Sequence, residues 1–198
     1  NTVALAAHPG YGLFAGGPMP DSTFNAILGA LPTLGKLKTI GTVITGYLGA
    51  LKQVDAISHL IEAWQLEQTE GSYILDPVLG DNGRIYVDHK LVTAMRNILL
   101  PLANFVTPNQ FELELLSGQT VRDVPSADKA AQSLLEQYPH LKGVLATGVN
   151  HIDNSIHDRF ISQTYIIDMA FKKRTNGIAG GGDLLTTIFA SWLASGHS

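Results

Sequence analysis

The segment around residue 183 has the composition of a phosphate-binding loop that leads into a helix. Three successive glycines, Gly180, Gly181 and Gly182, precede Asp183 and an apolar stretch over residues 184–193. Because glycine has no side chain, the backbone N–H groups of such a run can point at an anion, and a helix start adds positive partial charge. Asp183 would stand where that anion reacts. The pattern indicates phosphoryl transfer; the alternative interpretation is a glycine turn with Asp183 as an ordinary N-cap.

A second pair of polar residues, Asn109 and Glu112, follows Pro108 at the expected start of a helix. An asparagine N-cap with a glutamate three residues later is the pattern of a capping box. The same spacing puts an amide oxygen and a carboxylate on one helix face, where they could jointly hold a hydrated Mg²⁺. The pair alone favours the capping box, and both interpretations stay open.

Three further candidates each have an ordinary explanation beside a functional one. Asp76 precedes Pro77 and is either a turn residue or a second charge near a metal and phosphates. Thr147 and Gly148 are either an ordinary strand residue followed by a turn residue, or a site in which the Thr147 hydroxyl donates to a phosphate oxygen and Gly148 forms the turn after it. Tyr47 is either a surface aromatic or a ring that stacks on a flat ligand.

Other familiar catalytic patterns are missing. His8, His89 and His151 have no partner at a metal-ligand spacing and are interpreted as structural or solvent-facing. Residues 12–17 lack the Lys-Ser/Thr ending of a P-loop, and no Ser-His-Asp arrangement is evident. The chemistry is therefore expected to depend on the carboxylates, amides and glycines named above.

The expected elements alternate between strand and helix. Short apolar runs bounded by turn residues predict strands over residues 1–6, 42–45, 73–75, 105–106, 144–147 and 165–167. Apolar residues at helical spacing predict helices over residues 21–31, 51–64, 91–98 and 109–117. Repeated strand–loop–helix units imply an α/β fold with a mainly parallel central sheet that helices cover on both faces.

In such a fold, ligands bind beyond the carboxyl ends of the parallel strands. The candidates fall at the expected strand ends: Tyr47, Asp76, Asn109, Thr147 and the glycine run. A stretch rich in glycine and proline over residues 8–20 suits a mobile flap. The sequence therefore predicts one site at one edge of the sheet.

Composition sets the broad class of the protein. With 198 residues, 45% hydrophobic and 15% charged, the chain is expected to be one globular domain over residues 1–198. The net charge of −4, without a sustained basic run, argues against a nucleic-acid partner. No apolar run reaches membrane-spanning length, so no membrane partner is expected. The lack of cysteine excludes disulfides and thiolate chemistry and agrees with a cytoplasmic protein.

Three stretches, in order, resemble one family. They are residues 45–49 (Thr-Gly-Tyr-Leu-Gly), residues 76–83 (Asp-Pro-Val-Leu-Gly-Asp-Asn-Gly) and residues 107–118, which begin Thr-Pro-Asn-Gln-Phe-Glu. Together with the glycine run and Asp183, they make nearly the whole chain similar to pyridoxal kinases, within the ribokinase-like superfamily of small-molecule kinases. The resemblance implies a three-layer α/β/α sandwich that transfers the γ-phosphate of ATP to the 5′-hydroxymethyl group of pyridoxal, pyridoxine or pyridoxamine, in vitamin B6 salvage.

The resemblance assigns catalytic roles to the loop. Asp183 would be the base that takes the proton from the substrate hydroxyl, and Gly180, Gly181 and Gly182 would form the anion hole for the transferring phosphoryl group. The family loop usually reads Gly-Thr-Gly-Asp or Gly-Ala-Gly-Asp, whereas Gly181 stands in the middle position here. The extra glycine gives the loop more conformational freedom, so it is expected to be less pre-organised.

The resemblance also implies where nucleotide and metal bind. Asn109 and Glu112 match the family's Asn-x-x-Glu motif, which acts on Mg²⁺ largely through water. Asp76 and Thr147 match positions near the phosphates of ATP, and Gly148 lies next to Thr147 in the chain. A monovalent cation is a further cofactor that such a kinase could require.

For the substrate, the resemblance implies that Thr2 and Tyr47 line the pyridine ring, while Asp183 contacts the hydroxyl. Closing of the flap would keep water from competing with the substrate alcohol. The family also implies a homodimer, a further strand before Asn1 and a helical segment after Ser198. The chain is therefore expected to be part of a longer protein.

Two alternatives to a pyridoxal kinase stay open. A hydroxymethylpyrimidine or sugar kinase of the same superfamily would share the phosphate machinery and differ in the ring pocket, where Tyr47 and residues 77–83 favour pyridoxal. A catalytically silent homologue would bind vitamin B6 or nucleotide without turnover, as Gly181 and the missing ends would allow.

Overall fold

The computed structural model describes residues 2–6, 13, 15–173 and 180–196. Parts of the expected flap, with His8, and the residues just before Gly180 lie outside this set. The helices are α1 (Asp21–Ala30), α2 (Leu51–Glu67), α3 (His89–Ala94), followed by a π-helical turn (Met95–Leu99), α4 (Gln110–Ser117), α5 (Val124–Gln137) and α6 (Gly181–Ala194). The strands are β1 (Val3–Leu5), β2 (Gly16–Pro18), β3 (Thr42–Thr45), β4 (Ser72–Leu75), β5 (Gly80–Asp81), β6 (Arg84–Ile85), β7 (Phe105–Val106), β8 (Gly143–Asn150), β9 (Ser155–Ser162) and β10 (Ile166–Lys172).

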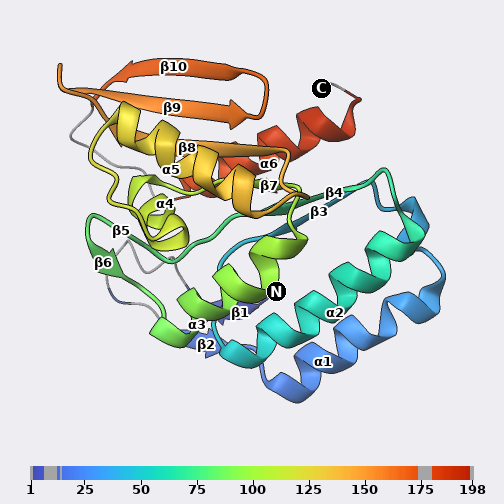
Figure 1. Cartoon of the computed structure of the whole chain (residues 1–198). Helices are drawn as coiled ribbons and strands as arrows, with labels where there is room; N and C mark the ends of the chain where they lie inside the picture. Colours follow the sequence, from blue (N-terminus) through green and yellow to red (C-terminus); the bar gives the residue numbers. More distant parts are fainter. Residues whose placement is uncertain (1, 7–12, 14, 174–179, 197–198) are drawn as a thin grey trace.

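Six strands form the central sheet in the order β10-β9-β8-β7-β4-β3 (Figure 1). Strands β3, β4, β7 and β8 run parallel to one another, and β9 and β10 add an antiparallel edge. Continuous apolar runs such as Tyr73, Ile74 and Leu75 in β4 are typical of parallel strands that are buried on both faces. The parallel strands therefore place their carboxyl ends at the same edge of the sheet.

Alternate strand residues pack into two separate cores. Tyr73 and Leu75 of β4 face a core that α1 to α5 cover, whereas Ile74 packs in a smaller core with Phe105 of β7 and Ala190 of α6. Because successive side chains of a strand point to opposite faces, helices lie on both sides of the sheet (Figure 1). The expected three-layer α/β/α, ribokinase-like architecture is confirmed.

Two of the expected strands need correction. The strand expected over residues 1–6 is the short β1, which pairs with β2 in a two-stranded sheet separate from the central one. The strand expected to end at Thr147 continues to Asn150, because an irregularity in the pairing with β9 at Thr147 and Gly148 lets the strand pass through a turn-like residue.

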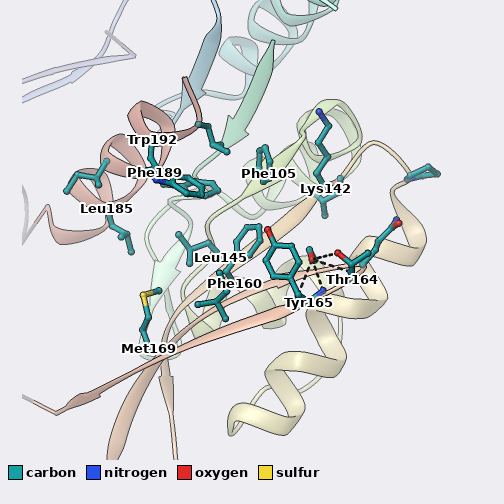
Figure 2. Close-up of a pocket in the computed structure, with 17 residues that line it drawn as sticks. Phe105, Lys142, Leu145, Phe160, Thr164, Tyr165, Met169, Leu185, Phe189 and Trp192 are labelled. Carbon is teal, nitrogen blue, oxygen red and sulfur yellow. Dashed lines mark hydrogen bonds between the residues drawn. The ribbon is translucent and has the colours of Figure 1, made fainter. Parts of the chain in front are cut away.

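The sheet face next to α6 carries an apolar groove of about 680 Å³ between that helix and the strands β9 and β10. Figure 2 shows aromatic side chains of α6, Phe189 and Trp192, on one side of it and Phe160 and Tyr165 on the other. Phe189 meets Phe105 edge to face, with 5.4 Å between the ring centroids. None of the candidate site residues lines this groove. The predicted chemistry must therefore lie elsewhere, at the strand ends.

Candidate active site

The carboxyl ends of four parallel strands bring the candidate residues to one edge of the sheet. Tyr47 follows β3, Asp76 follows β4, and Asn109 lies three residues beyond β7. Asn109 forms an isolated parallel bridge to Thr147 in β8. This arrangement agrees with the placement expected from the sequence.

Two hydroxyl groups and a carboxylate fasten α6 to these strand ends. Thr186 Oγ1 of α6 donates to Asp76 Oδ2 at 2.9 Å, and Thr107 Oγ1 lies 2.9 Å from Thr186 Oγ1. A hydroxyl carries a single hydrogen, so Thr107 donates to Thr186 while Thr186 donates to Asp76. All three side chains are buried. The contacts fix the first turns of α6 against the ends of β4 and β7.

Asp183 lies one helical turn before Thr186. Residues three apart lie on the same face of a helix, so the Thr186 contacts also bring the Asp183 carboxylate towards Asp76. The negative charge of Asp183 indeed contributes to a raised pKa of Asp76, after the larger effect of burial. Asp183 itself is exposed in the first turn of α6. The structure thus holds this carboxylate beside the strand ends and open to a ligand.

The three glycines form the turn into α6. Gly180 is the N-cap with a φ of +86°, a left-handed conformation that favours glycine. Gly181 and Gly182 take the first helical positions, where backbone N–H groups have no partner within the helix. A Cβ atom at Gly181 would meet no atom within 4 Å, so the alanine or threonine that is usual in the resembled family fits this backbone. The helix start offers donors and a positive dipole end to an anion.

Thr186 was not among the residues that the sequence pointed to, and its replacement by valine tests its structural role. The change keeps the side-chain shape but leaves the buried Asp76 and Thr107 without their partner. We expect the free energy of unfolding to fall by about 1–3 kcal/mol, as measured by denaturant titration. Thr187→Val is the matched control, since the exposed Thr187 only bonds back to the Asp183 carbonyl. Similar losses in the two variants would contradict the anchoring role.

Asn109 and Glu112 form a complete capping box at the start of α4. Asn109 Oδ1 accepts from the Glu112 N–H, and Glu112 Oε2 accepts from the Asn109 N–H, both at 2.9 Å. Glu112 Oε1 also accepts from the N–H groups of Leu79 (2.9 Å) and Gly80 (3.3 Å), and Asn109 Nδ2 donates to the Gly80 carbonyl. The pair therefore ties α4 to the segment after β4. A metal would meet these side chains through their remaining lone pairs.

Burial and neighbouring negative charge raise the pKa values of two carboxylates of the site, Asp76 and Glu112. Burial is the main reason that the pKa of Asp76 rises to about 6 and that of Glu112 to about 7. The negative charge of Asp183 raises the pKa of Asp76 further, and the negative charge of Asp76 raises the pKa of Glu112 further. A cation among these groups would relieve the repulsion, and carboxylate oxygens are the ligands that Mg²⁺ prefers. The donor set therefore fits a magnesium ion.

The structure also brings Thr2 and Tyr47 together. Thr2 Oγ1 donates to the Tyr47 carbonyl at 2.6 Å, and the carbonyl of Thr2 accepts from Gln53 Nε2 at 2.6 Å. Gln53 is fully buried, and its Oε1 accepts from the N–H groups of Gly49 and Ala50. Tyr47 is 37% exposed. Gln53 therefore positions the segment that carries both expected ring contacts.

Thr147 and Gly148 lie at the irregular point of β8. The Thr147 N–H donates to the Pro108 carbonyl at 2.9 Å, which holds Thr147 beside the start of α4. Gly148 has a φ of +64°, and its N–H donates to Asp158 Oδ1 of β9 at 2.8 Å. The structure thus brings Thr147 close to Asn109, whereas Gly148 is tied to the antiparallel edge.

Comparisons with known proteins point to one group of kinases. A family model for phosphomethylpyrimidine kinase matches residues 36–198. A pyridoxal kinase of Rubrobacter xylanophilus is 33% identical, over 100% of this chain and 69% of its own length. The crystal structure of a pyridoxal kinase from Entamoeba histolytica has a TM-score of 0.91 at 28% identity, over 99% of this chain and 70% of that chain.

A further solved structure has a ligand in place. The pyridoxal kinase of Leishmania donovani in complex with ADP and pyridoxamine has a TM-score of 0.87 at 28% identity, over 100% of this chain and 71% of that chain. The chain spans 63% of the length of two yeast relatives that it matches. It belongs to the phosphomethylpyrimidine kinase family and has the ribokinase-like fold of its pyridoxal kinase relatives.

Proposed function

We propose that the protein transfers the γ-phosphate of ATP to the 5′-hydroxymethyl group of pyridoxal, pyridoxine or pyridoxamine. The observation that carries the proposal is the start of α6, where Gly180 and the exposed Asp183 are anchored at the strand ends by the bond from Thr186 to Asp76. A helix start with an adjacent carboxylate suits phosphoryl transfer to an alcohol. The relative solved with ADP and pyridoxamine supports the substrate class.

Asp183 acts as the base in this proposal. Its carboxylate accepts the proton of the 5′-hydroxyl as that oxygen bonds to the γ-phosphorus, and the bond from phosphorus to the ADP oxygen breaks. The N–H groups at Gly180, Gly181 and Gly182 stabilise the charge on the transferring phosphoryl group. Positioning and electrostatic stabilisation then supply most of the rate, since the phosphoryl group itself needs little covalent help.

Asn109 and Glu112 hold Mg²⁺ in this proposal, through water, because their direct bonds already serve the capping box. The ion neutralises phosphate charge when it is bound. Asp76 is a further charge near the ion, and Thr147 donates its hydroxyl to a phosphate oxygen, with Gly148 shaping the turn beside it. A requirement for a monovalent cation stays a prediction.

Tyr47 and Thr2 line the pyridine ring in this proposal. The hydroxyl of Thr2 is already bonded to the Tyr47 carbonyl, so Thr2 serves to place the Tyr47 segment. The exposed part of the Tyr47 ring is then the surface on which a flat pyridine can stack.

The substrate is tested by comparing phosphorylation rates for pyridoxal, pyridoxine, pyridoxamine, hydroxymethylpyrimidine and ribose, with ATP and Mg²⁺. We expect the three vitamin B6 forms to have the highest kcat/KM. A higher value for hydroxymethylpyrimidine or ribose would assign the chain to another kinase of the superfamily. Binding of pyridoxal and ATP without ADP formation in the presence of any of these acceptors would identify a catalytically silent homologue.

The assembly and location of the protein are further predictions. No helix in the described part of the chain is long and apolar enough to cross a membrane. We propose that the protein works in the cytoplasm, as a homodimer, and that residues 1–198 contribute to a single kinase domain. Light scattering of the purified protein tests the oligomeric state.

A further inference from the structure

The hairpin between β8 and β9 carries a cluster of polar side chains that the proposed phosphoryl transfer does not use. His151, Asp153 and His157 each offer one ligand atom, and these atoms lie within 4.8 Å of one another. His151 and Asp153 belong to the connection, and His157 lies on β9 opposite Val149. His151 has no partner at a familiar metal-ligand spacing in the sequence, and it is the hairpin that brings the three residues together.

His157 is held in an orientation that suits a metal ligand. Its side chain is only 11% exposed, and its Nδ1 lies 2.7 Å from Asp168 Oδ1 of β10. Arg159 lies 3.1 Å from the same oxygen and keeps Asp168 in place. The bond to His157 and then the contact with Arg159 lower the pKa of Asp168. With Nδ1–H bonded to Asp168, the lone pair of Nε2 faces the cluster, 2.9 Å from Ser155 Oγ. The Ser155 hydroxyl has a single hydrogen for Nε2 or Asp153 Oδ1, so a metal on Nε2 leaves this hydrogen for Asp153. A carboxylate behind a histidine is the usual support of a zinc ligand.

The other two side chains have room to close on an ion. The side chains of His151 and Asp153 are 31% and 64% exposed, and His151 Nδ1 lies 3.0 Å from Asp153 Oδ1. The same oxygen accepts from the Ser155 N–H and hydroxyl, and these bonds hold the pKa of Asp153 well below its usual range. Ligand atoms on one tetrahedral Zn²⁺ lie roughly 3.4 Å apart, so small rotations of the exposed side chains suffice.

We propose that His151, Asp153 and His157 bind one Zn²⁺ ion, with water as the fourth ligand. Two imidazoles and one carboxylate suit a borderline ion such as Zn²⁺, whereas Mg²⁺ prefers oxygen ligands alone. The ion links the connection to β9 and thereby stiffens the hairpin. This site is independent of the proposed kinase activity, because its ligands are separate from the carboxylates at the strand ends.

The test is a titration of metal-free protein with Zn²⁺ against a chromophoric chelator, with Co²⁺ as a spectroscopic probe of tetrahedral coordination. We expect one ion per chain. Asp153→Asn and His157→Ala should each weaken binding at least about tenfold, and Asp168→Asn, behind His157, should weaken it by about 10- to 100-fold. The exposed His89 of α3 provides the matched control, and His89→Ala should bind as the wild type does.

Asp153 lies in an exposed connection, so its variant gives an answer even if His157→Ala fails to fold. Unchanged Zn²⁺ affinity in Asp153→Asn would overturn the proposal. Loss of the bound ion in Asp76→Asn, but not in the hairpin variants, would also contradict the zinc site. Displacement of Zn²⁺ by an equal concentration of Mg²⁺ would contradict it as well. Tetrahedral Co²⁺ spectra that persist in Asp76→Asn and disappear in Asp153→Asn would support it.

Discussion

Replacing Asp183 by asparagine is expected to lower kcat for pyridoxal by about 10²- to 10⁴-fold, which is the usual contribution of a general base. The affinity for pyridoxal and ATP should change little, because the amide has the same shape and Asp183 lies exposed at the start of α6. The backbone contacts of the turn are unaffected. Steady-state rates combined with equilibrium binding of pyridoxal measure the two effects separately.

Asp55→Asn is the matched control for this substitution, since Asp55 is an exposed aspartate on α2 with no predicted role in the site. It should leave kcat unchanged. Equal rates in the wild type and the Asp183→Asn variant would remove the proposed base. Loss of pyridoxal binding together with kcat would assign Asp183 to substrate binding and not to proton transfer.

The strand ends of the site could be predicted because proline marks them. Pro77 and Pro108 lack the N–H that a sheet ladder needs, so β4 and β7 end just before them. The polar residues beside these prolines, Asp76 and Asn109, are therefore forced to the carboxyl edge of the sheet. This local signal does not depend on how helices pack.

Thr186 could not be predicted in the same way. A threonine inside an apolar helix gives no sign of its partner, and its role follows from the face with which α6 meets β4 and β7. Gln53 accepts from the Ala50 N–H at the start of α2, but alanine at the N-cap leaves the sequence without the Ser or Thr that marks a capping box. Its bond to Thr2, 51 residues away along the chain, depends on tertiary structure.

Strand β9 was not predicted because charged residues occupy its half-buried positions. Arg159 forms an ion pair with Asp128 of α5 and a second one with Asp168 of β10, and His157 also bonds to Asp168. Paired in this way, these side chains can be buried where the strand pattern calls for apolar ones. Sequence patterns detect hydrophobic alternation and not charge pairing between distant elements.

Replacing Glu112 by alanine is expected to lower the free energy of unfolding by about 3 kcal/mol, because three backbone N–H groups lose their acceptor. These donors belong to Leu79, Gly80 and Asn109, and Glu112, which accepts from them, is only 5% exposed. Glu114→Ala is the matched control on the same helix, since Glu114 accepts from a single N–H, that of Val121. We expect Glu114→Ala to lower the free energy of unfolding by about 1 kcal/mol, with both variants measured by denaturant titration.

The stability loss of Glu112→Ala should also depend on pH. Burial raises the pKa of Glu112 from 4.5 to about 7, so the folded protein holds this proton more tightly than the unfolded chain does. The free energy of unfolding of the wild type therefore falls as the pH rises between these values, and the variant lacks this fall. The difference between the two proteins is then larger at about pH 5 than at about pH 8.

At the higher pH, Mg²⁺ should stabilise the wild type more than the variant, since the ion favours the ionised carboxylate. A loss equal to that of Glu114→Ala at both pH values, with no difference in the response to Mg²⁺, would contradict both the capping and the metal-binding role of Glu112.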